Sequence, residues 1–242
     1  MIHFGIITPT YKRTRFLPPF IRNVQRQSYS EWTLALIHDG PDEKETAEVV
    51  RRSAQGDVRI KYWETSVHSG TWGHKTRCFG IQRLAESMPT SQYILSWDDD
   101  DQFYPEALAN INRAIDETGY PDLLLVPIKH KWRNKLPVPG IPPRSNTPGN
   151  ICNMNLCVKI ETALKYHEKS LRLENPYHQD FYYYRSICDD PSTKVCLANI
   201  SNIGCVDGLR FWATLRWTVW PRPLNVYDTT FMRQLRRLMP RG

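Results

Sequence analysis

The sequence predicts an α/β protein built on an open, mostly parallel, doubly wound sheet, with helices on both faces and a basic aromatic C-terminal tail. Two observations lead to this fold class. Short β-rich runs alternate with helical patterns through the first half of the chain, and strands joined in this way are typically parallel. Polar stretches follow the first, second and fourth runs, and ligands bind at the carboxyl ends of the strands in such sheets.

The expected strands are short, apolar and rich in β-branched or aromatic residues. They cover residues 2–8, 32–38, 58–64, 93–97, 122–129, 151–160 and 194–200. The expected helices lie between these runs, and several begin with a proline or an acidic residue, as helix N-termini often do. They cover residues 18–27, 42–54, 75–87, 105–117, 161–168 and 178–187. Up to residue 129, the pattern is therefore a regular alternation of strand and helix.

The composition indicates a globular protein and bears on the cellular compartment in which we expect it. The chain has 242 residues, of which 40% are hydrophobic and 24% charged. No apolar run approaches the ~20 residues of a membrane span, and the N-terminus does not fit a secretory signal. The six cysteines form no CxxC pair, so we expect a reduced, cytoplasmic protein with free thiols.

Four consecutive aspartates, Asp98 to Asp101, follow the apolar run at residues 93–97. On an extended chain, residues two apart point to the same side, so Asp98 and Asp100 should project together into a cleft. Two carboxylates at the ligand end of a sheet suit Mg²⁺ or Mn²⁺, which bind a few carboxylates and complete their shell with phosphate and water oxygens. An acidic surface turn is the alternative interpretation.

Other polar residues also occupy places where a ligand could bind. Asp39 follows the second strand, where an acidic residue often binds a ribose or base, although an Asp before Gly also forms turns. No G-x-G-x-x-G follows the first strand, which disfavours a dinucleotide fold. Lys75 and Arg77 lie at a helix start, and they suit either phosphate or solvent. Asp180 stands among aromatic residues, as either a general base or a helix-start residue.

Five segments, in this order, resemble the family-2 glycosyltransferases of the GT-A fold. They are GIITPTYKR, LALIHDGPDE, KTRCFGI, YILSWDDDDQFYPEAL and HQDFYYYR, and together they span about residues 2–187. The resemblance implies an inverting transfer of a sugar from a nucleoside-diphosphate sugar, most often UDP-linked, to an acceptor hydroxyl. It also implies a divalent metal cofactor, Mn²⁺ or Mg²⁺.

The resemblance also implies roles for individual residues. The implied nucleotide-sugar-binding residues are Thr8, Pro9, Thr10, Tyr11, Arg13, Asp39, Lys75, Arg77, Asp98 and Asp99. Asp39 would bind the base, Asp100 would hold the metal and Asp180 would be the catalytic base. The sequence departs from the family pattern at Gln179, where a second acidic residue is usual, and at Cys78, where asparagine is usual.

We expect a GT-A domain at residues 1–200 and a basic aromatic tail at residues 201–242. Residues 1–128 would form the nucleotide-sugar-binding half and residues 129–200 the acceptor-side half, with a proline-rich loop at 133–149 that shapes the acceptor side. The tail pattern predicts an amphipathic basic helix at 228–240, suited to a membrane surface, to self-association or to packing on its own domain.

Two other classes of function stay open at this stage. Trp212, Trp217 and Trp220 are interleaved with arginines, a pattern that suits stacking on nucleic acid. The protein would then be a nucleic-acid-binding module or a glycosyltransferase with a nucleic-acid acceptor. A metal-dependent nucleotidyltransferase is the third class, and it would release pyrophosphate where a glycosyltransferase releases a nucleoside diphosphate.

Overall fold

The computed structural model describes residues 1–42, 44–88, 91–130, 146–148, 150–171, 178–200 and 203–206. Most of the proline-rich loop at 133–149 and the amphipathic pattern at 228–240 lie outside the described residues. No helix in the described part of the chain is long and apolar enough to cross a membrane. All six cysteines are free thiols.

A seven-stranded sheet forms the centre of the molecule, and its strand order is β3-β2-β1-β4-β8-β6-β9. The strands are β1 (Phe4–Thr10), β2 (Trp32–His38), β3 (Ile60–Glu64), β4 (Tyr93–Ser96), β6 (Leu123–Leu125), β8 (Leu156–Lys159) and β9 (Val195–Leu197). Strands β1 to β4 pair in parallel, and so do β6 and β9. The predicted open, mostly parallel sheet is therefore confirmed.

Strand β8 differs from the expected parallel pattern. It lies between β4 and β6 and pairs antiparallel with both. The expectation of parallel strands applies where a crossover helix joins them, because such a connection returns the chain to the same end of the sheet. The described residues between β6 and β8 contain no α-helix, and the two strands pair antiparallel.

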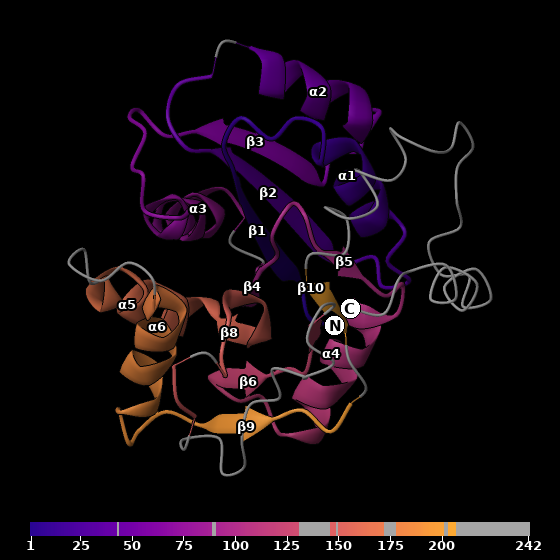
Figure 1. Cartoon of the computed structure of the whole chain (residues 1–242). Helices are drawn as coiled ribbons and strands as arrows, with labels where there is room; N and C mark the ends of the chain where they lie inside the picture. Colours follow the sequence, from indigo (N-terminus) through magenta and orange to yellow (C-terminus); the bar gives the residue numbers. More distant parts are fainter. Residues whose placement is uncertain are drawn as a thin grey trace, which may run out of the picture.

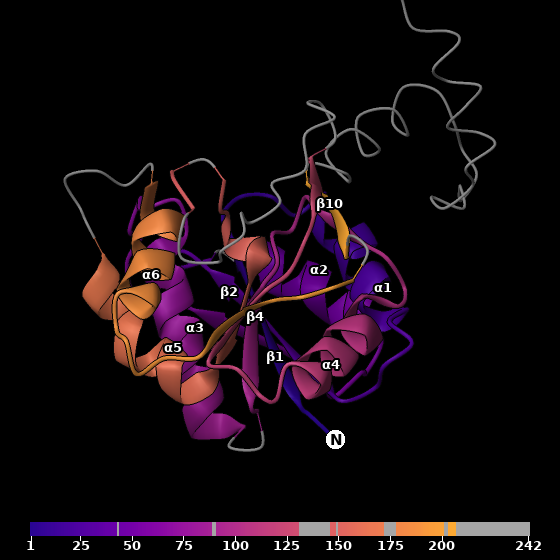
Figure 2. The same cartoon turned by 90° about the horizontal axis from the view of Figure 1, so that it is seen from below.

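Helices cover both faces of the sheet, as expected for a doubly wound fold (Figure 1). Helices α1 (Leu17–Gln25), α2 (Glu45–Ala54) and α4 (Ala107–Glu117) enclose one apolar core. Helices α3 (His74–Ser87), α5 (Ile160–Tyr166) and α6 (Gln179–Cys188) enclose the other. Figure 2 shows these two layers on opposite sides of the sheet. Strands β1 and β2 contribute apolar side chains to both cores, which explains their nearly continuous apolar sequences.

A second, three-stranded sheet has the order β5-β10-β7. It comprises β5 (Gln102–Phe103), β7 (Lys129–His130) and β10 (Gly204–Val206), and the sequence patterns do not predict these strands. Strand β10 belongs to the segment that the sequence analysis assigns to the tail. A side chain at Gly204 would overlap the carbonyl oxygen of Gln102, so glycine allows the two backbones to approach.

Helix α3 packs unusually close to the sheet at Gly80. A Cβ atom at this position would overlap Cδ1 of Ile37 on β2 and lie 2.9 Å from Cγ2 of Ile7 on β1. The absence of a side chain therefore lets α3 approach two strands that carry predicted site residues at their carboxyl ends. This contact fixes the start of α3, with His74 and Arg77, beside the end of β1.

Candidate active site

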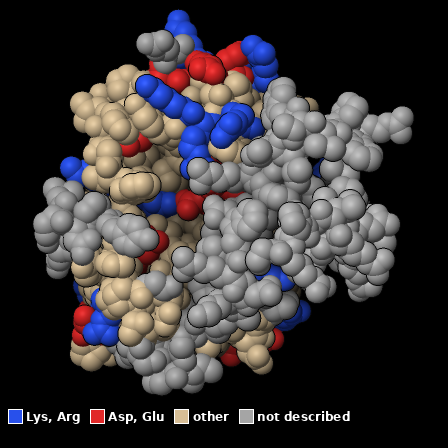
Figure 3. All heavy atoms as spheres, in the orientation of Figure 1, with Lys and Arg blue, Asp and Glu red and all other residues tan. Residues whose placement is uncertain are grey.

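A cavity of about 510 Å³ lies at the carboxyl ends of β1, β2 and β4, and this size suits a small organic ligand. Its lining residues are Pro9, Thr10, Tyr11, Arg13, Asp39, His68, Gly70, Trp72, Gly73, Arg77, Asp98 and Asp100. Figure 3 shows basic and acidic side chains meeting in a hollow on this face of the molecule. The cavity is where the doubly wound fold predicts a ligand.

The four aspartates form a turn rather than an extended strand, because β4 already ends at Ser96. The turn is closed by the N–H of Asp101, which donates to the carbonyl of Asp98 at 3.2 Å. Asp98 and Asp100 both line the cavity, as the alternation predicts. Asp99 is fully buried beneath them.

Asp99 is held by residues that follow β1. The hydroxyl of Thr10 donates to Oδ2 of Asp99 at 2.8 Å, and Nη1 of Arg13 lies 3.2 Å from Oδ1. Burial raises the pKa of Asp99 to about 7, although the charge of Arg13 and the Thr10 hydrogen bond oppose this shift. Asp99 therefore ties the aspartate turn to the end of β1 and does not itself open onto the cavity.

Two arginines offset part of the negative charge of the aspartate turn. Arg13 also pairs with Asp100, so one guanidinium spans two neighbouring carboxylates. Arg77 pairs with Asp98, and its Nη1 donates to the carbonyl of Trp72 at 3.2 Å. These three ion pairs bring together segments that are far apart in the sequence, and they place two cations at the wall of the cavity.

The aspartates fit a divalent cation that takes most of its ligands from a substrate. The side chains of Asp98 and Asp100 are 39% and 11% exposed, and both face the cavity. Within the described residues, no three His, Cys, Asp or Glu side chains form a group that could hold a metal ion by themselves. Mg²⁺ and Mn²⁺ commonly use one or two protein carboxylates together with phosphate and water oxygens, which matches this donor set.

The other end of the cavity combines an aromatic surface with a carboxylate. The ring of Tyr11 stacks on that of His68, with centroids 4.0 Å apart and an interplanar angle of 13°. Asp39 accepts hydrogen bonds from the N–H and hydroxyl of Ser69, at 3.0 and 3.1 Å. Nδ1 of His68 also lies 3.0 Å from Oδ2 of Asp39. A carboxylate has about four acceptor positions, so Asp39 keeps room for a further hydrogen bond beside the aromatic surface.

The loop before α3 has left-handed backbone at three residues: Gly70, Trp72 and Gly73, with φ of 62°, 54° and 81°. A Cβ atom at Gly73 would lie 2.8 Å from Cγ of Pro9, so glycine is required by both conformation and space. The indole of Trp72 is 78% exposed at the rim of the cavity. Strained residues of this kind persist where the surrounding contacts hold them, and here Arg77 binds the Trp72 carbonyl.

Asp180 lies in the first turn of α6, close to the start of α3. Its carboxylate accepts hydrogen bonds from the backbone N–H and side-chain Nδ2 of Asn153, at 3.2 and 2.7 Å. Burial raises the pKa of Asp180 to about 6, with Asp98 adding to the shift and Arg77 opposing it. This carboxylate is therefore ionised at neutral pH and basic enough to accept a proton.

His74, the first residue of α3, closes another side of Asp180. Its Nε2 atom lies 3.6 Å from Oδ1 of the carboxylate. Burial, together with the charge of Arg77 and the neighbouring His167, lowers the pKa of His74 to about 2. The imidazole is therefore neutral at physiological pH and contributes shape and polarity rather than charge.

The structure brings eight of the predicted site residues to the wall of one cavity: Pro9, Thr10, Tyr11, Arg13, Asp39, Arg77, Asp98 and Asp100. Asp99 and Asp180 do not line this cavity; Asp99 contacts Arg13, and Asp180 contacts Asn153. Thr8 is fully buried and Lys75 is exposed, and neither lines the cavity.

Sequence reasoning did not single out His68, Trp72, His74 or Asn153. Gly70 and Gly73 are a sequence signal for the loop that carries the first two, and Gly73 allows the backbone to approach Pro9. No local sequence signal marks Asn153, which reaches Asp180 across 27 residues of chain.

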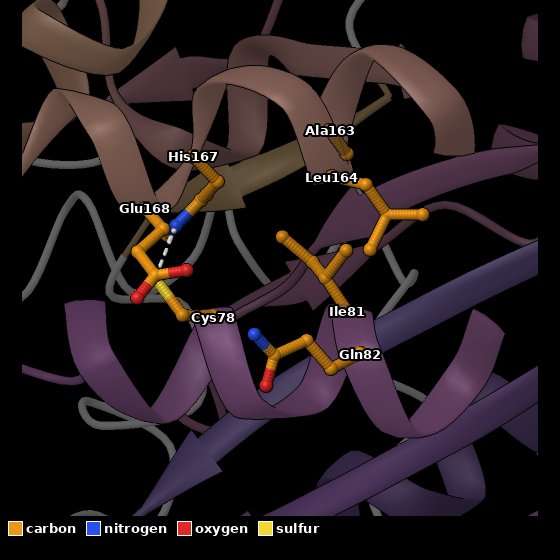
Figure 4. A pocket seen from close by; sticks show the side chains of 7 residues that line it. All are labelled: Cys78, Ile81, Gln82, Ala163, Leu164, His167 and Glu168. Carbon is orange, nitrogen blue, oxygen red and sulfur yellow. Dashed lines mark hydrogen bonds between the residues drawn. The ribbon is translucent and has the colours of Figure 1, made fainter. Parts of the chain in front are cut away.

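A second cavity, of about 20 Å³, lies between α3 and α5 and is large enough for no more than a water molecule. Figure 4 shows Cys78 and His167 facing each other across it, with 2.9 Å between Sγ and Nδ1. Burial raises the pKa of Cys78 to about 12 and lowers that of His167 to about 3, so both groups are neutral. The pair joins two helices and lacks the thiolate that a nucleophile requires.

Comparison with known proteins decides the family. The sequence model described as "Glycosyl transferase family 2" matches residues 5–171. The chain belongs to this family. The prediction of a family-2 glycosyltransferase is therefore confirmed, and the match covers the first strand, the aspartate turn and β8.

Among curated proteins, the chain is 28% identical over 116 residues to "Bifunctional glycosyltransferase pgtA" of Dictyostelium discoideum, covering 48% of this chain and 15% of the relative. It is 28% identical over 105 residues to "Putative colanic acid biosynthesis glycosyl transferase WcaA" of Escherichia coli K12, covering 43% of this chain and 35% of the relative. The matched part is thus well under half of either relative.

Among solved structures, the chain is similar to residues 1–349 of S. aureus TarS. The complex of that fragment with UDP has a TM-score of 0.64 at 13% identity, covering 88% of this chain and 63% of the 1–349 fragment. The complex with UDP-GlcNAc has a TM-score of 0.63 at 15% identity, covering 85% and 58%. These similarities confirm the GT-A fold.

Proposed function

We propose that the protein is an inverting glycosyltransferase that moves a sugar from a nucleoside-diphosphate sugar, UDP-linked, to an acceptor hydroxyl. The observation that carries the proposal is a single cavity with an aromatic and carboxylate end, at Tyr11 and Asp39, and a charged end, at Arg13, Arg77 and the aspartate turn. Family membership and the UDP complexes of the structurally similar TarS support the donor class.

The donor would lie along the length of the cavity. The nucleobase stacks on Tyr11 and donates an N–H to Asp39, because a flat heterocycle needs one aromatic face and one acceptor at its edge. The diphosphate meets Arg13 and Arg77, whose planar guanidinium groups match phosphate oxygens. The transferred sugar then lies near Asp98, which faces the cavity.

The metal in this proposal is Mn²⁺ or Mg²⁺, held by Asp100. When bound, such a cation neutralises the negative charge that develops on the leaving diphosphate. Arg13 pairs with Asp100 in the structure, so a cation held by Asp100 would compete with this ion pair and would leave the guanidinium available to the phosphates. Asp98 pairs with Arg77 at the cavity wall.

Asp180 is the proposed general base. It accepts the proton of the acceptor hydroxyl while that oxygen forms a bond to the anomeric carbon. The bond from this carbon to the diphosphate oxygen breaks on the opposite face, and the nucleoside diphosphate leaves with the electron pair. One displacement of this kind inverts the anomeric configuration, and Asp180 stores the proton for release to solvent.

Purified protein incubated with a panel of nucleotide sugars, with Mn²⁺, with Mg²⁺ and without metal, tests the proposal. We expect release of a nucleoside diphosphate from one or more UDP-sugars. The Asp180→Asn variant should bind the same donor with similar affinity, because the carboxamide keeps the shape of the carboxylate, and it should lose turnover. If no nucleotide sugar binds or reacts, the proposal is wrong, and release of pyrophosphate would instead indicate a nucleotidyltransferase.

A further inference from the structure

Asp180 accepts two hydrogen bonds from a residue on a different segment of the chain. Asn153 engages both carboxylate oxygens, with its backbone N–H on Oδ2 at 3.2 Å and its Nδ2 on Oδ1 at 2.7 Å. Asn153 is buried. Two donors from one buried residue limit the rotation of the carboxylate, so its direction is set before any substrate arrives.

The turn that carries Asn153 is itself held in place. This 3₁₀ helix, η2 (Asn153–Asn155), immediately precedes β8 in the main sheet. The backbone N–H of Cys152 donates to Oδ1 of Asn155 at 3.0 Å, and Nδ2 of Asn155 donates to the carbonyl of Val126 at 2.8 Å. A side chain on such a braced turn can position a neighbour accurately.

His74 limits Asp180 from the side of α3. It is buried, and its ring nitrogen lies 3.6 Å from Oδ1. The side chain of Asp180 is 29% exposed, so the part of the carboxylate not covered by Asn153 and His74 remains open. The open part is where an acceptor hydroxyl could approach.

We infer that Asn153 and His74 are positioning residues for Asp180: Asn153 fixes the direction and the proton affinity of the carboxylate, and His74 fixes its place. The inference rests on the proposed function, in which Asp180 is the general base. The residue before Asp180 is Gln179, so no second carboxylate adjoins the proposed base. Asn153 on η2 and His74 on α3 are the neighbours that we assign to its positioning.

Other titratable groups near Asp180 could also affect its proton affinity. On α3, Arg77 is a cation and His74 is neutral, and after β4 Asp98 is an anion that pairs with Arg77. Cys152 precedes η2, and burial together with Asp180 raises the pKa of its thiol, which stays neutral. His178 precedes α6 on the same segment as Asp180. Three contacts oppose the rise in the pKa of Asp180: the charge of Arg77, the backbone N–H of Asn153 and the backbone hydrogen bond of Asp180 itself. The side-chain Nδ2 of Asn153 donates to the same carboxylate, so Asn153 is the one neutral side chain among them that a substitution can remove without changing a charge.

The test measures kcat and kcat/KM against pH for the full chain, together with donor affinity by calorimetry. Asn153→Ala removes one donor to the ionised carboxylate. The apparent pKa on the acid side of the pH–rate profile (the acid limb) should therefore rise by about one unit, and kcat should fall about tenfold. Asn153→Asp places a second carboxylate against Asp180, so the limb should rise further, because two close carboxylates share one proton. Donor affinity should stay within about twofold in both variants, because neither change touches the cavity wall.

His74→Phe separates an effect on the place of Asp180 from an effect on its proton affinity. It keeps a ring of similar size and removes the nitrogen atoms, so we expect a fall in kcat of a few-fold with no movement of the acid limb. Asn146→Ala is the matched control, because this buried asparagine donates to Oη of Tyr184 at 3.3 Å, one turn along α6. Asn146→Ala should leave the acid limb in place even if it lowers thermal stability.

The outcomes separate this inference from the proposed function. A folded Asn153→Ala or Asn153→Asp variant with the wild-type pH profile and kcat would overturn the inference. Should Asn153→Asp fail to fold, Asn153→Gln serves in its place: it keeps the amide, and it should recover part of the activity lost in Asn153→Ala. Turnover retained by Asp180→Asn would contradict the assignment of the base itself, whatever the Asn153 variants do.

Discussion

The close packing of α3 on the sheet predicts an unusual response to Gly80→Ala. In most helices this change is favourable by about 1 kcal/mol, because alanine has the higher helix propensity. At Gly80, however, the new Cβ would overlap Cδ1 of Ile37 and lie 2.9 Å from Cγ2 of Ile7. Carbon atoms prefer separations of about 3.5–4.0 Å, so α3 or the two strands must move apart.

The size of the effect follows from the two opposing contributions. Overpacking of a tight core costs about 1–3 kcal/mol, which equals or exceeds the gain of about 1 kcal/mol in helix propensity. We therefore expect Gly80→Ala to lower the free energy of unfolding by up to about 2 kcal/mol. Ile37→Val removes the Cδ1 atom and should cost about 1 kcal/mol by itself.

The double variant gives the decisive comparison. Removing Cδ1 of Ile37 makes room for the new Cβ, so Gly80→Ala and Ile37→Val together should cost less than the sum of the single changes, with a coupling of about 1 kcal/mol. Urea unfolding measures each free energy, and an unchanged m-value shows that the transition stays comparable. Donor affinity should fall in Gly80→Ala and recover in the double variant, because α3 carries Arg77.

Additive effects would refute the reasoning, and so would a Gly80→Ala variant more stable than the wild type. Either result would mean that α3 does not depend on contact between Gly80 and Ile37. The position of Arg77 would then need another explanation.

Three further predictions concern the cavity. Tyr11→Ala should raise the Kd for UDP about 5- to 150-fold, because stacking on a base contributes about 1–3 kcal/mol, whereas Tyr11→Phe should bind normally in calorimetry. Lys75→Ala should change donor Kd by less than about twofold, since this exposed residue lies outside the cavity wall, and a large loss would contradict the placement. Because burial raises the pKa of Asp180 to about 6, well above its ordinary value, kcat/KM should fall as the pH drops through that range. If kcat/KM instead fell only near the ordinary pKa of aspartate, burial of Asp180 would not be raising its pKa.

Much of the main sheet could be predicted from the sequence, because β1, β2 and β4 are apolar runs that fill both cores. The direction of β8 could not be predicted, since it depends on which strands become its neighbours rather than on its own residues. Strands β5, β7 and β10 have two or three residues each, too few to show a period of two.

In the candidate site, too, local sequence patterns identified individual residues but not the distant residues that contact them. Asp98 and Asp100 both line the cavity, as predicted, but the backbone there is a turn and not the extended chain on which the prediction rested. The neutralising partners Arg13 and Arg77 come from other segments, and no local pattern could pair them with particular aspartates. Adjacent helix residues differ in direction by about 100°, which is why His74 is buried while Lys75 is exposed. The roles of the site residues stay predictions until variants are measured.

Calorimetric titration of UDP into the wild-type protein and the Asp39→Ala variant tests the central claim most directly, because binding needs neither the acceptor nor the correct sugar. The account predicts that UDP binds the wild type with one site per chain. It also predicts that Asp39→Ala weakens binding about tenfold, since the base loses a hydrogen bond to a charged acceptor. Equal binding by both proteins, or no binding of any nucleoside diphosphate by the wild type, would contradict it.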